Sequence, residues 1–254
     1  MTHSAIVLAG SRPGRDAFAA SFGTDLKALI PVGGEPMVRR PVRALLASGS
    51  IGKVLVLSQA PDRLAAVLPE DPRLSVGRSD GTIAETLLTL IDSGEVEWPL
   101  LVTTGDHALL EPAMIDEFCN AASDSDVALG VVERATLMQR FPGAKRTWIK
   151  FRGGACTGAN LFALRSAEVA PAIELWRSAE QGRKKGWRVL MLFGPLILLG
   201  AGLRLLSLDQ VLARVGRRLG LKVKAVRLSN PLAGIDVDKA ADHALVTEIL
   251  EGRA

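Results

Sequence analysis

The chain contains no tyrosine, and aromatic residues make up only 4% of its 254 residues. It has two cysteines, Cys119 and Cys156, and three histidines. Because the cysteines are far apart and no Cys or His stands at metal-ligand spacing, a disulfide scaffold and a zinc ribbon are excluded. The N-terminal stretch has no basic region, and its apolar run is too short for a signal peptide. We therefore expect a cytoplasmic protein.

The composition also lacks the marks of fibrous, repetitive and disordered chains. Glycine and proline follow no collagen-like period, and no repeat of 20–50 residues is evident. Charged residues are 23% and hydrophobic residues 48%, as in ordinary globular proteins. We expect a single domain over residues 1–254, with a basic and apolar helical insert at residues 177–222.

Positive charge is concentrated in that insert and just after it. The whole chain has a formal net charge of +4, but twelve Lys and Arg against two acids stand between Arg177 and Arg227. Such a segment favours an anionic partner, either a phosphorylated substrate, a nucleic acid or a lipid surface. A plain solvated basic face is the alternative.

Strand and helix patterns alternate over the first two thirds of the chain. Strands separated by helices of ten to fifteen residues predict a mostly parallel sheet with helices on both faces, a three-layer α/β/α sandwich. In such folds ligands bind beyond the carboxyl ends of the strands, so the segments 10–15 and 105–107 should share one rim. The predicted strands are Ala5–Ala9, Lys53–Leu57, Leu100–Thr103 and Asp126–Val132, and the predicted helices are Pro36–Ser48, Thr82–Ile91 and Glu111–Ala122.

The turn after the first strand combines small residues with two arginines. Gly10 and Gly14 allow close approach of the backbone to a phosphate, and Arg12 and Arg15 add forked donors suited to phosphate oxygens. The turn is neither a Walker A loop nor the three-glycine dinucleotide motif. Taken alone, it also fits an ordinary tight turn.

Several stretches together resemble the MobA-like nucleotidyltransferases. The resemblance rests on Leu8, Ala9, Gly10, Arg15, Lys27, Gly34, Pro36 and Met37, which match the family's opening strand, its LAGGxxxR turn, its lysine and its G-x-P-M helix start. Ser11 replaces a family glycine. The resemblance implies a GT-A-like nucleotidyltransferase fold and places Leu8, Ala9, Gly10, Ser11, Arg12, Gly14, Arg15 and Lys27 at the nucleotide.

Two acidic stretches extend the resemblance. The strand that ends at Gly105-Asp106 is similar to the family strand whose aspartate binds magnesium, and Asp236-Val-Asp238 is similar to its D-V-D stretch. The resemblance implies Mg²⁺ as the cofactor, with Asp106, Asp238 and Asp236 as its ligands. Mg²⁺ bound by few carboxylates suits a site whose remaining ligands are phosphate oxygens. The resemblance also assigns catalysis to Arg15, Lys27 and Asp106. His107 is the weaker catalytic candidate.

Base and acceptor recognition are expected in two further stretches. Asp80, Gly81 and Thr82 precede a helix and correspond to the family loop that contacts the nucleotide, although Asp80 or Thr82 also suits a helix N-cap. The stretch around T-G-x-N resembles the acceptor strand of sugar-phosphate uridylyltransferases, and a glycine-containing β-bulge is the alternative. The expected acceptor-binding residues are Lys150, Arg152, Gly154, Gly158 and Asn160.

The insert carries a fifteen-residue uncharged run, Val189–Leu203, flanked by cations. The run is shorter than the roughly 20 residues that span a bilayer, and Gly194-Pro195 interrupts it. Ser207–Gln210 has capping-box spacing and predicts a helix that ends at Gly220. The insert can cap the acceptor pocket, contact an anionic membrane at its inner face, form a dimer contact, or simply pack on the sheet.

These observations favour a Mg²⁺-dependent nucleotidyltransferase. It would move a nucleoside monophosphate from a nucleoside triphosphate to a phosphorylated small molecule or lipid-headgroup precursor and release pyrophosphate. The alternatives are a non-catalytic nucleotide-binding module and a peripheral membrane-binding protein that uses the basic insert. We do not expect a nucleic-acid partner, because the cations alternate with leucine rather than with stacking aromatics.

Overall fold

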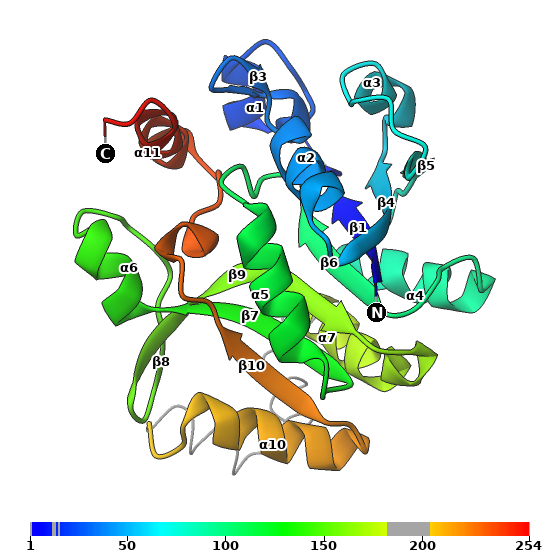
Figure 1. Cartoon of the computed structure of the whole chain (residues 1–254), viewed down its shortest axis with the longest axis vertical. Helices are drawn as coiled ribbons and strands as arrows, with labels where there is room; N and C mark the ends of the chain where they lie inside the picture. Colours follow the sequence, from blue (N-terminus) through cyan, green and yellow to red (C-terminus); the bar gives the residue numbers. More distant parts are fainter. Residues whose placement is uncertain (1, 12–13, 15, 182–203, 254) are drawn as a thin grey trace.

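The fold is described from a computed structural model of the chain, which defines residues 2–11, 14, 16–181 and 204–253. Its centre is an eight-stranded mixed sheet with the strand order β10-β7-β9-β6-β1-β4-β5, and β8 pairs with β9 (Figure 1). The strands are β1 (His3–Leu8), β4 (Ile51–Ser58), β5 (Leu74–Arg78), β6 (Leu100–Thr104), β7 (Val127–Glu133), β8 (Ile149–Phe151), β9 (Gly154–Leu164) and β10 (Val223–Arg227).

All of these strands except β9 run in the same direction. β1 is parallel to β4 and β6, β4 is parallel to β5, and β7 is parallel to β10. The long strand β9 lies antiparallel between β6 and β7. The predicted mostly parallel, mixed sheet is therefore confirmed, and β9 brings its amino-terminal half to the rim where β6 and β7 end.

Helices cover both faces of the sheet, as the sequence pattern predicts. α2 (Arg39–Ala47) and α5 (Pro112–Ala122) lie on one face, while α4 (Ile83–Ser93) and α7 (Ala170–Gln181) lie on the other (Figure 1). Within β1, Ala5 and Val7 belong to the first core and Ile6 to the second, because successive side chains of a strand point to opposite faces. The two cores fix the strand ends that carry the site.

The remaining elements lie around the rim and the sheet edges. Several of them are single turns or short hairpin arms between the main layers. They are α1 (Ala17–Ser21), η1 (Lys27–Leu29), β2 (Pro31–Val32), β3 (Glu35–Pro36), α3 (Pro61–Ala65), α6 (Arg134–Arg140), η2 (Ala167–Val169), α10 (Leu208–Leu219), η4 (Pro231–Gly234) and α11 (Ala240–Leu250).

The predicted start of the Pro36–Ser48 helix is wrong. The helix expected from Pro36 begins at Arg39, because Glu35–Pro36 instead pairs with Pro31–Val32 as a small hairpin. Gly33 and Gly34 form its turn with φ values of 58° and 81°. A two-residue hairpin turn of this kind needs positive φ at both positions, which glycine adopts without steric cost.

The helix predicted at the carboxyl end of the insert is confirmed. α10 begins at a capping box formed by Ser207 and Gln210 and ends at Gly220 with φ 70°. The apolar run at 189–203, with its alternatives as lid, membrane contact or dimer contact, falls outside the described residues. Among the helices that the structure describes, none is long and apolar enough to cross a membrane.

Cations of the basic segment pair with Asp209 inside it and with Asp124 and Glu133 outside it. Arg227 pairs with Asp209 at 2.8 Å and with Glu133 at 3.0 Å, and Lys222 and Lys224 both pair with Asp124. These exposed pairs reduce the positive charge that the segment presents. They also bind β10 to its neighbours at this edge of the sheet.

Candidate functional site

The loops after β1 and β6 meet at one rim of the sheet, as expected from the parallel topology. The Gly105 N–H donates a hydrogen bond to the Leu8 carbonyl at 2.9 Å, and a Cβ on Gly105 would lie 3.1 Å from the Cβ of Ala9. The predicted nucleotide residues Leu8, Ala9 and Gly10 therefore lie beside Asp106. The close packing of the two loops fixes the position from which Asp106 projects.

Lys27 joins the two acidic stretches that the sequence singled out. Its Nζ donates to Asp106 Oδ2 and to Asp238 Oδ1, each at 2.6 Å. These carboxylates are far apart in the sequence, yet one ammonium lies between them. Asp106 and Asp238 are thus close enough to share a single cation.

The charges of this triad stabilise one another. Burial by itself would lower the pKa of Lys27, but the neighbouring Asp106 and Asp238 outweigh burial and raise its pKa above the usual value. Lys27 therefore carries its full positive charge at neutral pH. The side chains of Lys27 and Asp106 are both 18% exposed, whereas that of Asp238 is 62% exposed, so the site opens to solvent on the Asp238 side.

Local contacts hold the two carboxylates in place. Thr104 Oγ1, at the end of β6, donates to Asp106 Oδ1 at 2.5 Å. The segment before α11 passes beside the loop that follows β6 (Figure 1), and the Val237 N–H donates to the Asp106 carbonyl at 3.1 Å. Upstream, Gly234 packs so tightly that a Cβ there would lie 2.9 Å from Leu137 Cδ1. The acidic stretch is therefore attached to β6 and to the core.

Asp236 occupies a different environment from Asp238. Its carboxylate forms an ion pair with Arg146 and accepts a hydrogen bond from Asn160 Nδ2 at 2.9 Å. Asn160 adopts φ 49°, a left-handed conformation that is uncommon for a residue other than glycine. The structure brings Asp236 to the predicted acceptor strand, and its assignment as a third metal ligand stays a prediction.

Among the described residues, the carboxylates beside Lys27 are suitable ligands for magnesium. No cluster of three His, Cys, Asp or Glu side chains able to hold a metal is found among them. Mg²⁺ is commonly held by one or two carboxylates, with water and substrate phosphates completing its shell. Asp106 and Asp238, which already share the Lys27 cation, provide two such carboxylates.

The phosphate-binding turn is only partly described. Arg12 and Arg15 lie outside the described residues, so their predicted roles stay predictions, while Gly14 has φ 109°, as expected of a glycine-dependent turn. Ser11 Oγ accepts a hydrogen bond from the Lys27 backbone N–H at 3.4 Å. The turn is therefore tied to the segment that carries the catalytic candidate.

Gln59, which the sequence reasoning missed, clamps the start of this turn. Its Oε1 accepts from the Ser11 N–H at 3.0 Å, and its Nε2 donates to the Ser11 carbonyl at 3.1 Å. A Cβ on Gly10 would lie 2.9 Å from the same carboxamide, so a larger residue there would displace the clamp. The residue directly after β4 gives no local signal of this role.

The predicted nucleotide loop contains a confirmed helix cap. Thr82 is the N-cap of α4, and with Glu85 it forms a capping box. Asp80 pairs instead with Arg78 at 2.8 Å on the exposed surface, and Gly81 lies beside Glu85. The expected nucleotide contacts of Asp80, Gly81 and Thr82 stay predictions.

Replacing Thr82 by alanine should lower the free energy of unfolding by about 1 kcal/mol, because the first turn of α4 loses a hydrogen-bonded cap. Urea-induced unfolding measures this change. Thr82→Ser keeps the hydroxyl and is the matched control, with stability close to that of the unchanged chain. An alanine variant as stable as the serine variant would contradict the capping role.

The predicted acceptor residues fall into two groups. Lys150, Arg152 and Gly154 lie in the β8–β9 hairpin, where Arg152 Nη2 donates to Gln210 of α10 at 3.2 Å. Asn160 lies further along β9 and faces Asp236, with Gly158 two residues before it. Gly154 lies six positions before Asn160 along β9. The structure therefore connects only the Asn160 end to the acidic stretch.

Neither His107 nor the cysteines has the properties of a catalyst. His107 is only 1% exposed, and burial lowers its pKa to about 4, so it is a neutral imidazole beneath the site. Cys119 and Cys156 are buried, and burial raises the pKa of Cys119 to about 12. Both thiols are therefore packing groups at neutral pH.

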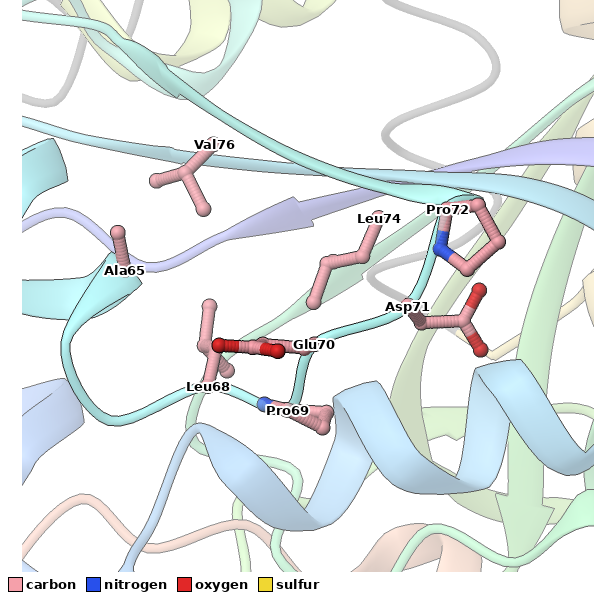
Figure 2. Close-up of a pocket in the computed structure, with 8 residues that line it drawn as sticks. All are labelled: Ala65, Leu68, Pro69, Glu70, Asp71, Pro72, Leu74 and Val76. Atoms are coloured by element: carbon pink, nitrogen blue, oxygen red, sulfur yellow. The ribbon is translucent and has the colours of Figure 1, made fainter.

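Two hollows differ in their chemistry. A wide hollow of about 620 Å³ lies beside α3 and the edge strand β5 (Figure 2), and none of the described residues that line it is cationic. A smaller hollow of about 30 Å³ contains Lys27 and Asp106 at the rim. A bound phosphate requires cationic or N–H donors, so the smaller hollow is the candidate site. The wide hollow is lined by Ala65, Leu68, Pro69, Glu70, Asp71, Pro72, Leu74 and Val76.

The sequence profile of the MobA-like NTP transferase domain matches residues 5–191, most of the chain and including Lys27 and Asp106. The chain belongs to this family. It is therefore a nucleotidyltransferase with the Rossmann-like fold expected from the sequence. Among curated proteins, none matches this transferase.

Solved structures share its fold over nearly the whole length. A hypothetical transferase from Thermus thermophilus is 33% identical, with a TM-score of 0.81, and covers 96% of this transferase and 100% of its own chain. Two others share the fold at low identity. A 4-diphosphocytidyl-2C-methyl-D-erythritol synthase from Anaerococcus prevotii is 11% identical, with a TM-score of 0.63 and coverage of 98% and 96%. A CMP:2-keto-3-deoxy-manno-octonic acid synthetase complexed with CTP is 14% identical, with a TM-score of 0.60 and coverage of 100% of both chains.

Proposed function

We propose that this nucleotidyltransferase transfers a nucleoside monophosphate from a nucleoside triphosphate to a phosphorylated small molecule or lipid-headgroup precursor, with Mg²⁺ as cofactor. The observation that carries the proposal is the Lys27 ammonium, bound to Asp106 and Asp238 beside the glycine-containing turn after β1. Two carboxylates and a lysine at the carboxyl ends of parallel strands form a site for a polyanion and its metal.

The charges of the chain's own residues match the demands of this reaction. Triphosphate and acceptor are both anions, and their repulsion opposes the approach that the transfer requires. Lys27 would bind the α-phosphate region and stabilise the negative charge that builds up as pyrophosphate leaves. Gly10 allows the backbone of the turn to approach the phosphates, and the Gln59 clamp fixes that backbone. Arg15, outside the described residues, would add a second cation.

Asp106 and Asp238 would hold the Mg²⁺ that the family resemblance implies. Bound there, Mg²⁺ would neutralise phosphate oxygens and act as a Lewis acid. A phosphate acceptor is already ionised at neutral pH, so it needs no general base. The neutral, buried His107 and the buried thiols are consistent with a site that uses no general base.

Two of the structural relatives provide a first choice of substrate. One is named as a diphosphocytidyl-methylerythritol synthase and another was solved with CTP. We therefore expect a cytidine or related triphosphate to be accepted and place CTP first in a panel with GTP, UTP and ATP. The acceptor would lie at the Asn160 end of β9, beside the acidic stretch.

The proposal is tested by thermal shift with each triphosphate and Mg²⁺, followed by a pyrophosphate assay on phosphorylated acceptors. We expect one triphosphate to raise the melting temperature more than the others and to release pyrophosphate only with an acceptor. Stabilisation without pyrophosphate under every pairing would show a non-catalytic nucleotide-binding module. No stabilisation by any triphosphate would reject the site itself.

A further inference from the structure

Arg146 lies at the centre of a buried ionic network behind the acidic stretch. It comes from the loop between α6 and β8, and its side chain is only 9% exposed. The guanidinium pairs with Asp236, donates from Nη1 to Asp242 Oδ1 at 3.3 Å, and donates to the Asp236 carbonyl at 3.4 Å. Neither the sequence motifs nor the family match assigned it a role.

This network reaches Asp238 through the backbone. Asp242, in the first turn of α11, accepts the Asp238 N–H at Oδ2, 3.2 Å away, while its other oxygen faces Arg146. Asp236 is held on its other side by Asn160. One guanidinium therefore connects both ends of the segment 236–242, and Asp238 lies between them. We propose that Arg146 is a positioning residue that holds Asp238 in register with Asp106 for metal binding.

Charge explains why a cation is required there. Asp236, Asp238 and Asp242 lie within seven residues, and Asp106 adds a fourth carboxylate. Lys27 and Arg146 supply two positive charges, so these six described groups together carry two negative charges. Without Arg146, Asp236 and Asp242 would lose their cationic partner in a largely buried position, and their mutual repulsion would displace the segment 236–242.

The shape of the guanidinium matters as well as its charge. A fork of N–H donors can face two carboxylates and a carbonyl together, whereas a lysine ammonium is a compact point charge. The structure offers a matched comparison in Arg227, which also bridges two carboxylates, Asp209 and Glu133, but on the exposed side of β10. Among the described residues, Arg227 forms no hydrogen bond or ion pair with the segment that carries Asp238.

The test compares Arg146→Met, Arg146→Lys and the control Arg227→Met. Binding of Mn²⁺ is followed by electron paramagnetic resonance with the most stabilising triphosphate and no acceptor, so that no turnover is required. Arg146→Met should weaken Mn²⁺ binding about 10–100-fold, which is the effect typical of groups that orient metal ligands. Arg146→Lys should recover part of the loss, and Arg227→Met should bind like the unchanged protein.

Turnover gives a second readout that a purely structural role would not move. Because Asp238 is displaced rather than removed, kcat should fall and the half-saturating Mg²⁺ concentration should rise, with a smaller change in KM for the triphosphate.

Should Arg146→Met fail to fold, Asp242→Asn keeps the side-chain volume, removes one ion pair, and should weaken Mn²⁺ binding severalfold. The positioning role of Arg146 rests on the proposed function, but different Mn²⁺ binding results would reject each of them.

Four experimental outcomes test the positioning role of Arg146 and separate it from the proposed function. Weak Mn²⁺ binding in the Arg146→Met variant, partly recovered in Arg146→Lys, supports the positioning role. Mn²⁺ binding equal to that of the unchanged protein, with only a lower melting temperature, overturns it and leaves the proposed function intact. Weakening of the same size in Arg227→Met also overturns it, because the effect would then be general. An unchanged protein that binds no Mn²⁺ with any triphosphate rejects both.

Discussion

Changing Asp106 to asparagine should reduce pyrophosphate release about a hundredfold or more, the scale on which a preorganised charged group acts in catalysis. The amide keeps the size of the side chain, and Thr104 can still donate to its oxygen, so the fold should persist. What is lost is the negative charge that faces Lys27 and would bind Mg²⁺. Steady-state pyrophosphate assays at saturating triphosphate measure the change.

Asp116→Asn is the matched control for this variant. Asp116 also accepts hydrogen bonds from hydroxyl groups, those of Ser48 and Ser50, but it lies in α5 away from the rim. This control should keep its turnover. Full activity in Asp106→Asn across all common triphosphates would show that Asp106 is not a metal ligand.

Replacing Lys27 by methionine should also lower kcat about a hundredfold or more, because the leaving pyrophosphate loses a cationic partner. A second effect requires no turnover. In the unchanged protein Mg²⁺ must compete with the ammonium for Asp106 and Asp238, and in the variant this competing ammonium is absent. Mg²⁺ alone should therefore raise the melting temperature of Lys27→Met more than that of the unchanged protein.

Lys224→Met provides the comparison for Lys27→Met. Lys224 likewise donates to two oxygens, Asp124 Oδ1 at 2.8 Å and the Ala121 carbonyl at 2.7 Å, but at the sheet edge. Its loss should change neither turnover nor the response to Mg²⁺. Unchanged turnover in Lys27→Met would remove this lysine from the reaction.

The parts of the site that could be predicted lie at the ends of regular elements. Asp106 follows a short apolar strand, and Gly10 follows another, so the rule that parallel strands end at one rim brings them together. Lys27 and Asp238 lie in less regular segments, and only their likeness to a family motif identified them. The ammonium between the two carboxylates then follows from the fold.

The parts that could not be predicted depend on contacts between residues that are far apart in the sequence. Arg146 binds groups 90 and 96 positions away along the chain, and no local spacing reports such a contact. Gln59 acts on Ser11 from 48 positions away. The separation of Lys150 and Arg152 from Asn160 also required the strand direction and the hairpin to be known. The predicted helix start at Pro36 was wrong because the Gly33-Gly34 turn lets Glu35–Pro36 pair with Pro31–Val32 as a hairpin, although the spacing of apolar residues indicated a helix.

The triangle of Lys27, Asp106 and Asp238 has a kinetic consequence. Its two ion pairs close chain segments of 79 and 211 residues. Loops of this length carry a high entropic cost of closure and form after local structure in a folding chain. A renatured sample should thus recover its helical circular dichroism before its catalytic competence, because the three charges meet only when distant segments have docked.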